Sequence, residues 1–92
     1  MFNFDLSDEL KFIIKKLAKK DRKRVEIINK KIKEIISNDS DTIDHYKNLK
    51  HDMSSLKRVH IDKSFVLTFS VDKAKNFILF LDFDHHDNIY KH

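Results

Sequence analysis

Residues 56–83 read LKRVHIDKSFVLTFSVDKAKNFILFLDF, and this stretch decides the fold. Apolar and β-branched residues dominate it, and two short polar segments interrupt it. The pattern predicts three consecutive strands, over 56–61, 65–71 and 77–83. Strands joined by such short connections pair antiparallel, so a three-strand meander is expected. The second and third runs are apolar at nearly every position, which is typical of strands that are covered on both faces.

The residues before this stretch predict one more strand and two helices. Residues 2–6 alternate apolar and polar side chains, which is the period of a half-buried strand. Ser7 and Asp21 are suitable N-caps for two helices whose apolar residues recur at helical spacing, and the polar run 37–41 ends the second helix. Residues 41–55 show no clear period, so an irregular connection with at most a short turn is expected there.

These elements together predict the fold class α+β. An N-terminal strand and a helical hairpin would pack on one face of a small, mainly antiparallel, twisted sheet, in the order strand, helix, helix, strand, strand, strand. Because a chain of 92 residues holds only one hydrophobic core, residues 1–92 are expected to form a single domain. The sequence shows neither a membrane-spanning run nor an export signal at its start, so a cytoplasmic protein with no membrane partner is expected.

The chain contains no Gly, Pro or Cys, and this absence excludes several kinds of site. Without Gly there is no P-loop and no dinucleotide-binding fingerprint. Without Cys there is no disulfide, no thiolate zinc site and no cysteine nucleophile. Any chemistry must therefore come from His, Tyr, Ser, Lys, Arg and the carboxylates.

A pair of histidines could supply acid–base chemistry. Alternation along the first strand of the meander places Arg58, His60 and Asp62 on one face and Lys57 on the other. His86 follows the third strand, and because the first and third strands both flank the second, His60 and His86 can face a common cleft. Two imidazoles that titrate near neutrality could move the protons of a phosphodiester cleavage, with a nearby cation stabilising the phosphoryl oxygens. Ordinary polar residues at strand ends would show the same pattern.

A metal site is the other interpretation of the histidines. The densest group of candidate ligands is Asp82, Asp84, His85, His86 and Asp87. Adjacent histidines that leave an extended strand point to opposite sides, and no second pair at i,i+4 spacing completes a tetrahedral set. The sequence therefore predicts no metal and no cofactor.

Lysines cluster in the predicted hairpin of this protein, whose formal net charge is +4. Asp21 is the only acidic residue between residues 11 and 24. The candidates for contact with the phosphates of a polyanion such as RNA are Lys15, Lys16, Lys19, Lys20 and Lys23. Such a ridge would bind phosphates, but a solvated lysine-rich helix face explains the same pattern.

The order of these features resembles the RelE/ParE superfamily of small bacterial and archaeal toxins, and within it the YafQ-like and RelE-like mRNA interferases. The resemblance covers nearly the whole chain, and its carriers are the opening strand and hairpin, Leu49-Lys50, residues 56–61, residues 65–69 and the ending 81–91. His86 stands four residues before Tyr90, as in the family's terminal signature. The resemblance implies a ribosome-dependent endoribonuclease that cuts mRNA by attack of the 2′-hydroxyl. It also implies a cognate antitoxin that occupies the cleft of the toxin. The toxin would be monomeric on its own and would form a hetero-oligomer with the antitoxin.

The resemblance further implies roles for individual residues. His60 matches the first YafQ-like histidine and His86 matches the second catalytic position, so that one would act as base and the other as acid, in either order. Tyr90 matches the terminal aromatic, which would orient the scissile phosphate or stack on a base. Arg58 would stabilise the phosphate. The weaker substrate-binding candidates are Lys57, Lys63, Lys91 and Asp62.

The chain departs from the family patterns at several positions. Val66 stands where many RelE-like toxins have an Arg in the middle strand, so the mechanism that relies on that Arg does not transfer. The YafQ-like pattern has an acidic residue near Ser64, and the nearest one here is Asp62. Lys47 takes the place of an upstream YafQ-like histidine. Two alternatives therefore stay open: a non-enzymatic, ParE-like inhibitor of DNA gyrase, and a catalytically degenerate homologue that only binds an antitoxin.

Overall fold

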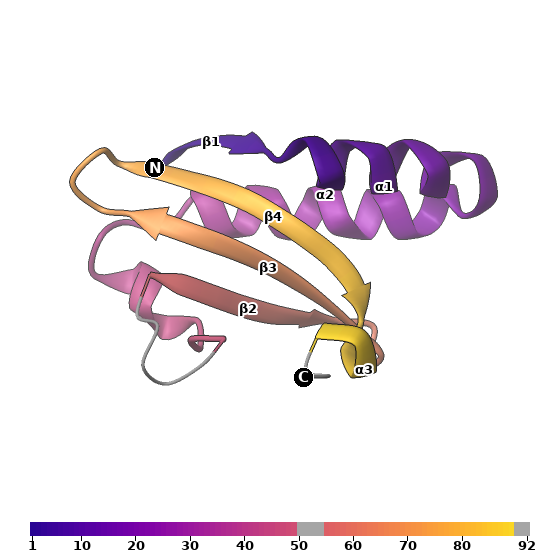
Figure 1. The fold of residues 1–92 in the computed structure, drawn as a ribbon. Helices are drawn as coiled ribbons and strands as arrows, with labels where there is room; N and C mark the ends of the chain where they lie inside the picture. Colours follow the sequence, from indigo (N-terminus) through magenta and orange to yellow (C-terminus); the bar gives the residue numbers. More distant parts are fainter. Residues whose placement is uncertain (50–54, 90–92) are drawn as a thin grey trace.

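The structure of the protein, a computed structural model, describes residues 1–49 and 55–89. Its elements are β1 (Asn3–Leu6), α1 (Asp8–Lys20), α2 (Arg22–Ile36), the 3₁₀-helix η1 (Thr42–His45), β2 (Leu56–Ile61), β3 (Phe65–Asp72), β4 (Phe77–His85) and α3 (His86–Ile89) (Figure 1). The predicted α+β class and the predicted order of the strands and the two long helices are confirmed. η1 is the short turn that the sequence allows before β2, and α3 is an addition after the last strand.

The four strands form one sheet in the order β1-β4-β3-β2. β2 pairs antiparallel with β3, and β3 with β4, which confirms the predicted meander, while β1 joins parallel to β4. The β3–β4 register shifts between Thr68 and Phe69, so that Leu81 has no register partner. A bulge of this kind bends the strand. At the bend the Leu81 carbonyl accepts a 2.6 Å hydrogen bond from the Ser7 hydroxyl, which anchors the start of α1 to β4.

Side-chain caps set where the two long helices begin. Ser7 Oγ accepts the Leu10 N–H at 3.1 Å, and Asp21 Oδ1 accepts the Arg24 N–H at 3.1 Å. Each cap satisfies an N–H group that has no partner inside its helix. Because Asp21 both ends α1 and caps α2, the helices form the predicted hairpin with a one-residue joint. No helix in the described part of the chain is long and apolar enough to span a membrane.

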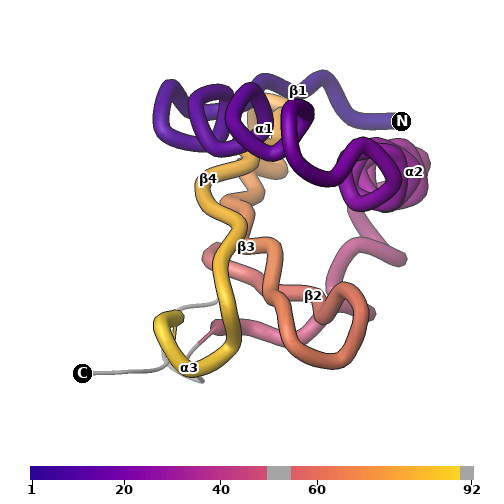
Figure 2. Tube along the Cα trace, turned by 90° about the vertical axis from the view of Figure 1, so that its right-hand side faces the viewer, coloured from indigo at the N-terminus to yellow at the C-terminus, as the bar shows by residue number. Residues whose placement is uncertain are grey.

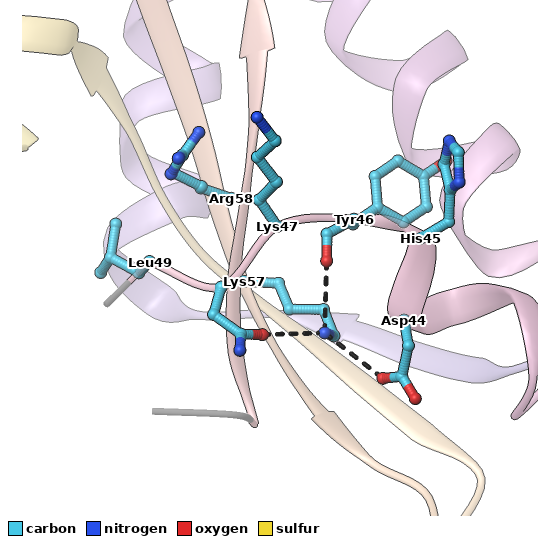
Figure 3. A pocket seen from close by; sticks show the side chains of 8 residues that line it. Asp44, His45, Tyr46, Lys47, Leu49, Lys57 and Arg58 are labelled. Atoms are coloured by element: carbon cyan, nitrogen blue, oxygen red, sulfur yellow. Dashed lines mark hydrogen bonds and ion pairs between the residues drawn. The ribbon is translucent and has the colours of Figure 1, made fainter. Parts of the chain in front are cut away.

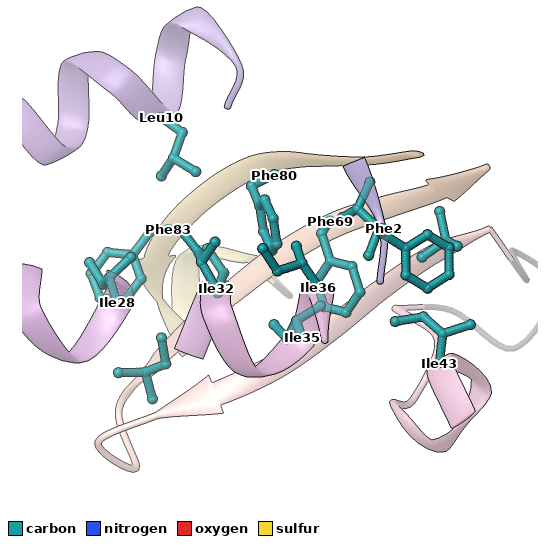
Figure 4. Packing of buried hydrophobic residues seen from close by; sticks show 14 residues of the cluster. Phe2, Leu10, Ile28, Ile32, Ile35, Ile36, Ile43, Phe69, Phe80 and Phe83 are labelled. Carbon is teal, nitrogen blue, oxygen red and sulfur yellow. The ribbon is translucent and has the colours of Figure 1, made fainter. Parts of the chain in front are cut away.

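The hairpin packs on one face of the sheet and builds the hydrophobic core (Figure 4). The buried residues of α2 recur at helical spacing: Ile28, Ile32, Ile35 and Ile36. They pack with aromatic rings from the central strands, Phe69, Phe80 and Phe83. Each such side chain stabilises the fold by about 1.5–3 kcal/mol when it is fully buried. The core therefore fixes the sheet against the hairpin and leaves the other face to carry the polar residues.

That other face is itself partly covered. Figures 1 and 2 show α3 on the side of the sheet away from the hairpin. Val66 and Thr68 alternate with the core residues of β3, so they face this side, and they are 0% and 4% exposed. The sequence predicts this cover from the apolar character of β3.

Candidate active site

Two imidazoles meet on the face of the sheet that carries α3. The ring centroids of His60, in β2, and His86, the first residue of α3, lie 5.4 Å apart, and the ring planes differ by 27°. The structure thus brings together His60, which the sequence places in the first strand of the meander, and His86, which it places just after the third. His60 is exposed and His86 is half-buried, so a substrate can reach the pair from solvent.

Hydrogen bonds fix the start of α3 and with it His86. The His86 N–H donates a 2.7 Å hydrogen bond to the carbonyl of Ser64, in the turn between β2 and β3. Asp84 of β4 accepts a 3.1 Å bond from the Asn88 side-chain amide, which ties α3 to its own strand. Asp87 Oδ1 lies 3.6 Å from His86 Nδ1. A carboxylate at that nitrogen can orient the ring and select its tautomer.

Cations and an apolar residue surround His60. Arg58 lies on the same face of β2 as His60. Val66 of β3, the register partner of His60, is fully buried. Loss of solvation is the main cause that lowers the pKa of His60 below its usual value. The positive charges of Arg58, His86 and Lys47 lower that pKa further. The lowered pKa favours the neutral form of the His60 ring, which is the form that can accept a proton.

A groove runs along the outer edge of β2 (Figure 3), and His60 lines its second pocket. Two adjoining pockets of about 610 and 340 Å³ form it, and their shared lining residues are His45, Tyr46, Lys47 and Arg58. The segment after η1 pairs with β2, because Arg58 N–H donates to the Lys47 carbonyl at 3.0 Å and Leu49 N–H donates to the Leu56 carbonyl at 2.8 Å. The groove wall is thus built by backbone hydrogen bonds, and Lys47 and Arg58 extend from it in the same direction (Figure 3).

Lys57 lies on the opposite face of β2 and holds this wall in place. Its side chain is 4% exposed, and its ammonium lies 3.4 Å from Asp44 Oδ1. The ammonium also donates to Asn48 Oδ1 at 2.9 Å and to the Tyr46 carbonyl at 3.3 Å (Figure 3). The sequence offers Lys57 as a weaker substrate-binding candidate, but the structure separates it from His60 because alternation turns it to the core side.

The expected placement of Asp62 on the face of His60 is wrong. β2 ends at Ile61, and Asp62 and Lys63 both have left-handed backbone conformations, with φ of 55° and 62°. The turn takes Asp62 out of the alternation and toward α2, where its carboxylate lies 3.7 Å from Arg24 Nε. Lys63 is exposed in the same turn and stays a candidate for substrate contact.

Two groups of candidates remain, the C-terminal residues and the lysines of the hairpin. Tyr90 and Lys91 fall outside the described residues. The lysines of the hairpin, Lys15, Lys16, Lys19, Lys20 and Lys23, are all exposed. Among residues 1–49 and 55–89, no three His, Asp or Glu side chains gather as ligands for a metal ion. His85 instead packs its ring against Phe65, with centroids 5.7 Å apart.

Lys47 and Asp87 join the site although neither is predicted as a site residue. Lys47 lies in a segment without periodicity, so its distance from His60 depends on how that segment pairs with β2. The only signal for it is the position of the upstream YafQ-like histidine. The sequence offers Asp87 only as a candidate metal ligand. Its position directly after His86 is the signal that could have predicted its carboxylate beside the His86 ring.

Two archaeal proteins have sequences similar to this chain over nearly its whole length. A protein of Methanocaldococcus jannaschii named "Putative toxin RelE4" is 50% identical over 91 residues, which make up 99% of this chain and 93% of that protein. A protein of Methanosarcina mazei named "Uncharacterized protein" is 48% identical over 90 residues, which make up 98% of this chain and 100% of that protein. No family model and no solved structure matches the chain. Identity of this level over nearly the full length of both chains shows that the protein belongs to the RelE-like toxin superfamily.

Proposed function

We propose that the protein is the toxin of a toxin–antitoxin pair and acts in the cytoplasm as a ribosome-dependent endoribonuclease that cleaves mRNA. The observation that carries this proposal is the stacked pair of His60 and His86, with centroids 5.4 Å apart and with Arg58 on the same face of β2. A protein that acted only by binding would have no need of such a pair. Membership of the RelE-like superfamily supports the same conclusion.

The arrangement suits cleavage by the 2′-hydroxyl. His60, whose pKa is lowered, takes the proton from the 2′-hydroxyl of the nucleotide before the cut. The 2′-oxygen bonds to phosphorus, and the bond from phosphorus to the 5′-oxygen of the next nucleotide breaks. His86 gives a proton to that leaving oxygen. The products are a 2′,3′-cyclic phosphate and a 5′-hydroxyl, so the reaction balances with the two histidines alone.

Cations would stabilise the charge that builds on the phosphoryl oxygens. Arg58 is the main candidate, since a guanidinium can donate two parallel hydrogen bonds to a phosphate. Lys47 lines the groove next to His60 and supplies a second positive charge. Lys63 would approach from the β2–β3 turn. By the family resemblance, Tyr90 would orient the scissile phosphate and Lys91 would contact the RNA.

A modified mRNA tests the proposed reaction. Purified protein is incubated with ribosomes programmed with mRNA, and we expect a cut that leaves a 5′-hydroxyl on the downstream fragment. A message with a 2′-deoxy nucleotide before the cut should stay intact, and cleavage of that message would contradict 2′-hydroxyl attack. Absence of any cleavage, together with inhibition of DNA supercoiling by gyrase, would favour the non-enzymatic alternative.

The second proposed partner is a cognate antitoxin. The M. jannaschii relative is named as a toxin, and proteins of this kind act in pairs, which supports an antitoxin for this chain. We expect the toxin alone to be monomeric and the antitoxin to form a hetero-oligomer with it. An antitoxin that covered the groove beside β2 would keep RNA away from His60.

The pH dependence of cleavage should report the lowered pKa of His60. As the base, His60 must be neutral. The acid limb, which is the fall of kcat/KM on the acid side of its pH profile, should therefore be centred below 6.5, the ordinary pKa of histidine. Lys47→Gln removes one charge that lowers this pKa, so the acid limb should move up toward 6.5, whereas Lys47→Arg should leave it in place. Cleavage rates measured from pH 5 to 8 check this. Identical limbs in all three proteins would contradict the assignment of His60 as the base.

The lysines of the hairpin should govern the salt dependence of ribosome binding. Lys15 and Lys19 are exposed and lie one helical turn apart on α1. Replacing both with Gln should weaken ribosome binding. If each lysine contacts one phosphate, the slope of log affinity against log salt concentration should become less steep by about 1.5. The matched control changes Lys30 and Lys33, two exposed lysines of α2. Equal salt slopes in the two double variants would show that Lys15 and Lys19 belong to a solvated helix face and contact no phosphates.

A further inference from the structure

One aromatic ring joins three elements at the end of the sheet next to the histidine pair. Phe65 is the first residue of β3 and is the register partner of His85, the last residue of β4. Its ring stacks on that of Phe83 with centroids 5.1 Å apart and planes 8° from parallel. The Arg24 guanidinium of α2 lies over the same ring, 4.4 Å from its centroid. A cation over an aromatic face is attracted by the ring's quadrupole.

Arg24 also holds the turn between β2 and β3. Its Nε lies 3.7 Å from Asp62 in that turn, and its guanidinium lies 3.5 Å from Asp21, the N-cap of α2. The Arg24 side chain is only 29% exposed, and its buried Nε makes no hydrogen bond with the described residues, so Arg24 binds Asp62 as an ion pair. Arg24 therefore joins the helical hairpin to this turn and to the ring of Phe65.

The same turn sets the position of His86. Ser64, which directly follows Asp62 and Lys63, presents the carbonyl that accepts the His86 N–H at 2.7 Å. Asp62 and Lys63 hold left-handed conformations without being glycine, and such conformations persist only where the surrounding structure enforces them. Removing the support of Arg24 would let this turn relax, and the Ser64 carbonyl would move with it.

We propose that Arg24 is a positioning residue for the histidine pair: by fixing Phe65 and the Asp62 turn against α2, it keeps the His86 ring stacked on His60. Arg24 touches neither histidine, so it acts through the turn. Its effect on cleavage rests on the proposed ribonuclease activity, whereas its effect on the geometry of the pair does not. The helical hairpin would thus contribute to the active site from the opposite side of the sheet.

Arg24→Gln, compared with Lys30→Gln, tests this role. Both changes remove one positive charge from α2, but Lys30 is exposed. In wild type, nuclear Overhauser effects should link the His60 and His86 ring protons, and Arg24→Gln should abolish them while Lys30→Gln retains them. Arg24→Lys keeps a cation near Phe65 and Asp62, so it should restore most of the signal. In cleavage assays, Arg24→Gln should lower kcat by about 10-fold or more with little change in KM.

The readouts separate this proposal from the ribonuclease itself. Thermal melting followed by circular dichroism sets a temperature at which every variant is folded. Retention of the imidazole contacts in folded Arg24→Gln would overturn the positioning role, whatever the cleavage rate. Loss of these contacts, with rescue by Arg24→Lys, would support it even if wild type cleaved no mRNA, in which case only the proposed function would fail.

Discussion

Replacing His86 by alanine is expected to slow cleavage of ribosome-bound mRNA by at least about 100-fold, and His60→Ala should have an effect of similar size. The first change removes the acid that protonates the leaving oxygen, and the second removes the base that activates the 2′-hydroxyl. Neither ring belongs to the hydrophobic core, so both variants should stay folded. Single-turnover cleavage at saturating ribosome concentration measures the loss, and circular dichroism checks the fold.

The double variant tests whether the two imidazoles act in one reaction. If they do, removing both should cost little more than removing one, because either loss already disables the same step. Losses that multiply would show that His60 and His86 act independently. A loss of cleavage that matched a loss of folded protein would contradict the catalytic assignment for either residue.

Alternation explains why the histidine pair could be predicted. Side chains at i and i+2 share a face of a strand, which places Arg58 and His60 together. A slip of one residue would move every core side chain of β2 to the wrong face, so the apolar pattern fixes this assignment strongly. The meander then makes β2 and β4 neighbours of β3, and His86 follows β4 directly. Local pattern and short connections were sufficient for this part of the site.

The rest depends on contacts that no local pattern encodes. The sequence predicts a polar turn after residue 61, but with no glycine in the chain nothing marks the left-handed backbone that turns Asp62 away from the face of His60. The face of Lys57 was predicted, but its burial depends on Asp44 and Asn48, which belong to a segment without periodicity. Lys47 reaches His60 because the same segment pairs with β2. Long-range pairing of an irregular segment decided these positions.

Two cations, Arg24 and Lys57, support different parts of the candidate site. Arg24 braces the β2–β3 turn that holds His86, and Lys57 braces the segment that carries Lys47. Both lie outside the face where the proposed chemistry occurs. In a small domain without disulfides, interactions of this kind can decide whether a surface groove keeps its shape.

Replacing Lys57 by alanine is expected to lower the free energy of unfolding by about 2–3 kcal/mol. The change removes a buried ammonium and leaves the Tyr46 carbonyl and Asn48 Oδ1 without the donor that now reaches both. Breaking a fully buried charge pair costs more, but Asp44 is 54% exposed and water can replace the ammonium on its side. For a domain of this size the melting temperature should fall by about 10–20 °C.

Lys73→Ala is the matched control, because Lys73 binds the same carboxylate from solvent. Its ammonium lies 2.6 Å from Asp44 Oδ2, and its side chain is 46% exposed. An ion pair at the surface contributes less than about 1 kcal/mol, so this variant should melt close to wild type. Equal losses in the two variants would mean that attraction to Asp44, rather than the buried hydrogen bonds of Lys57, stabilises the groove wall. A large loss in Lys57→Ala alone would show that the buried ammonium of Lys57 stabilises the segment on β2 beyond what its backbone hydrogen bonds supply.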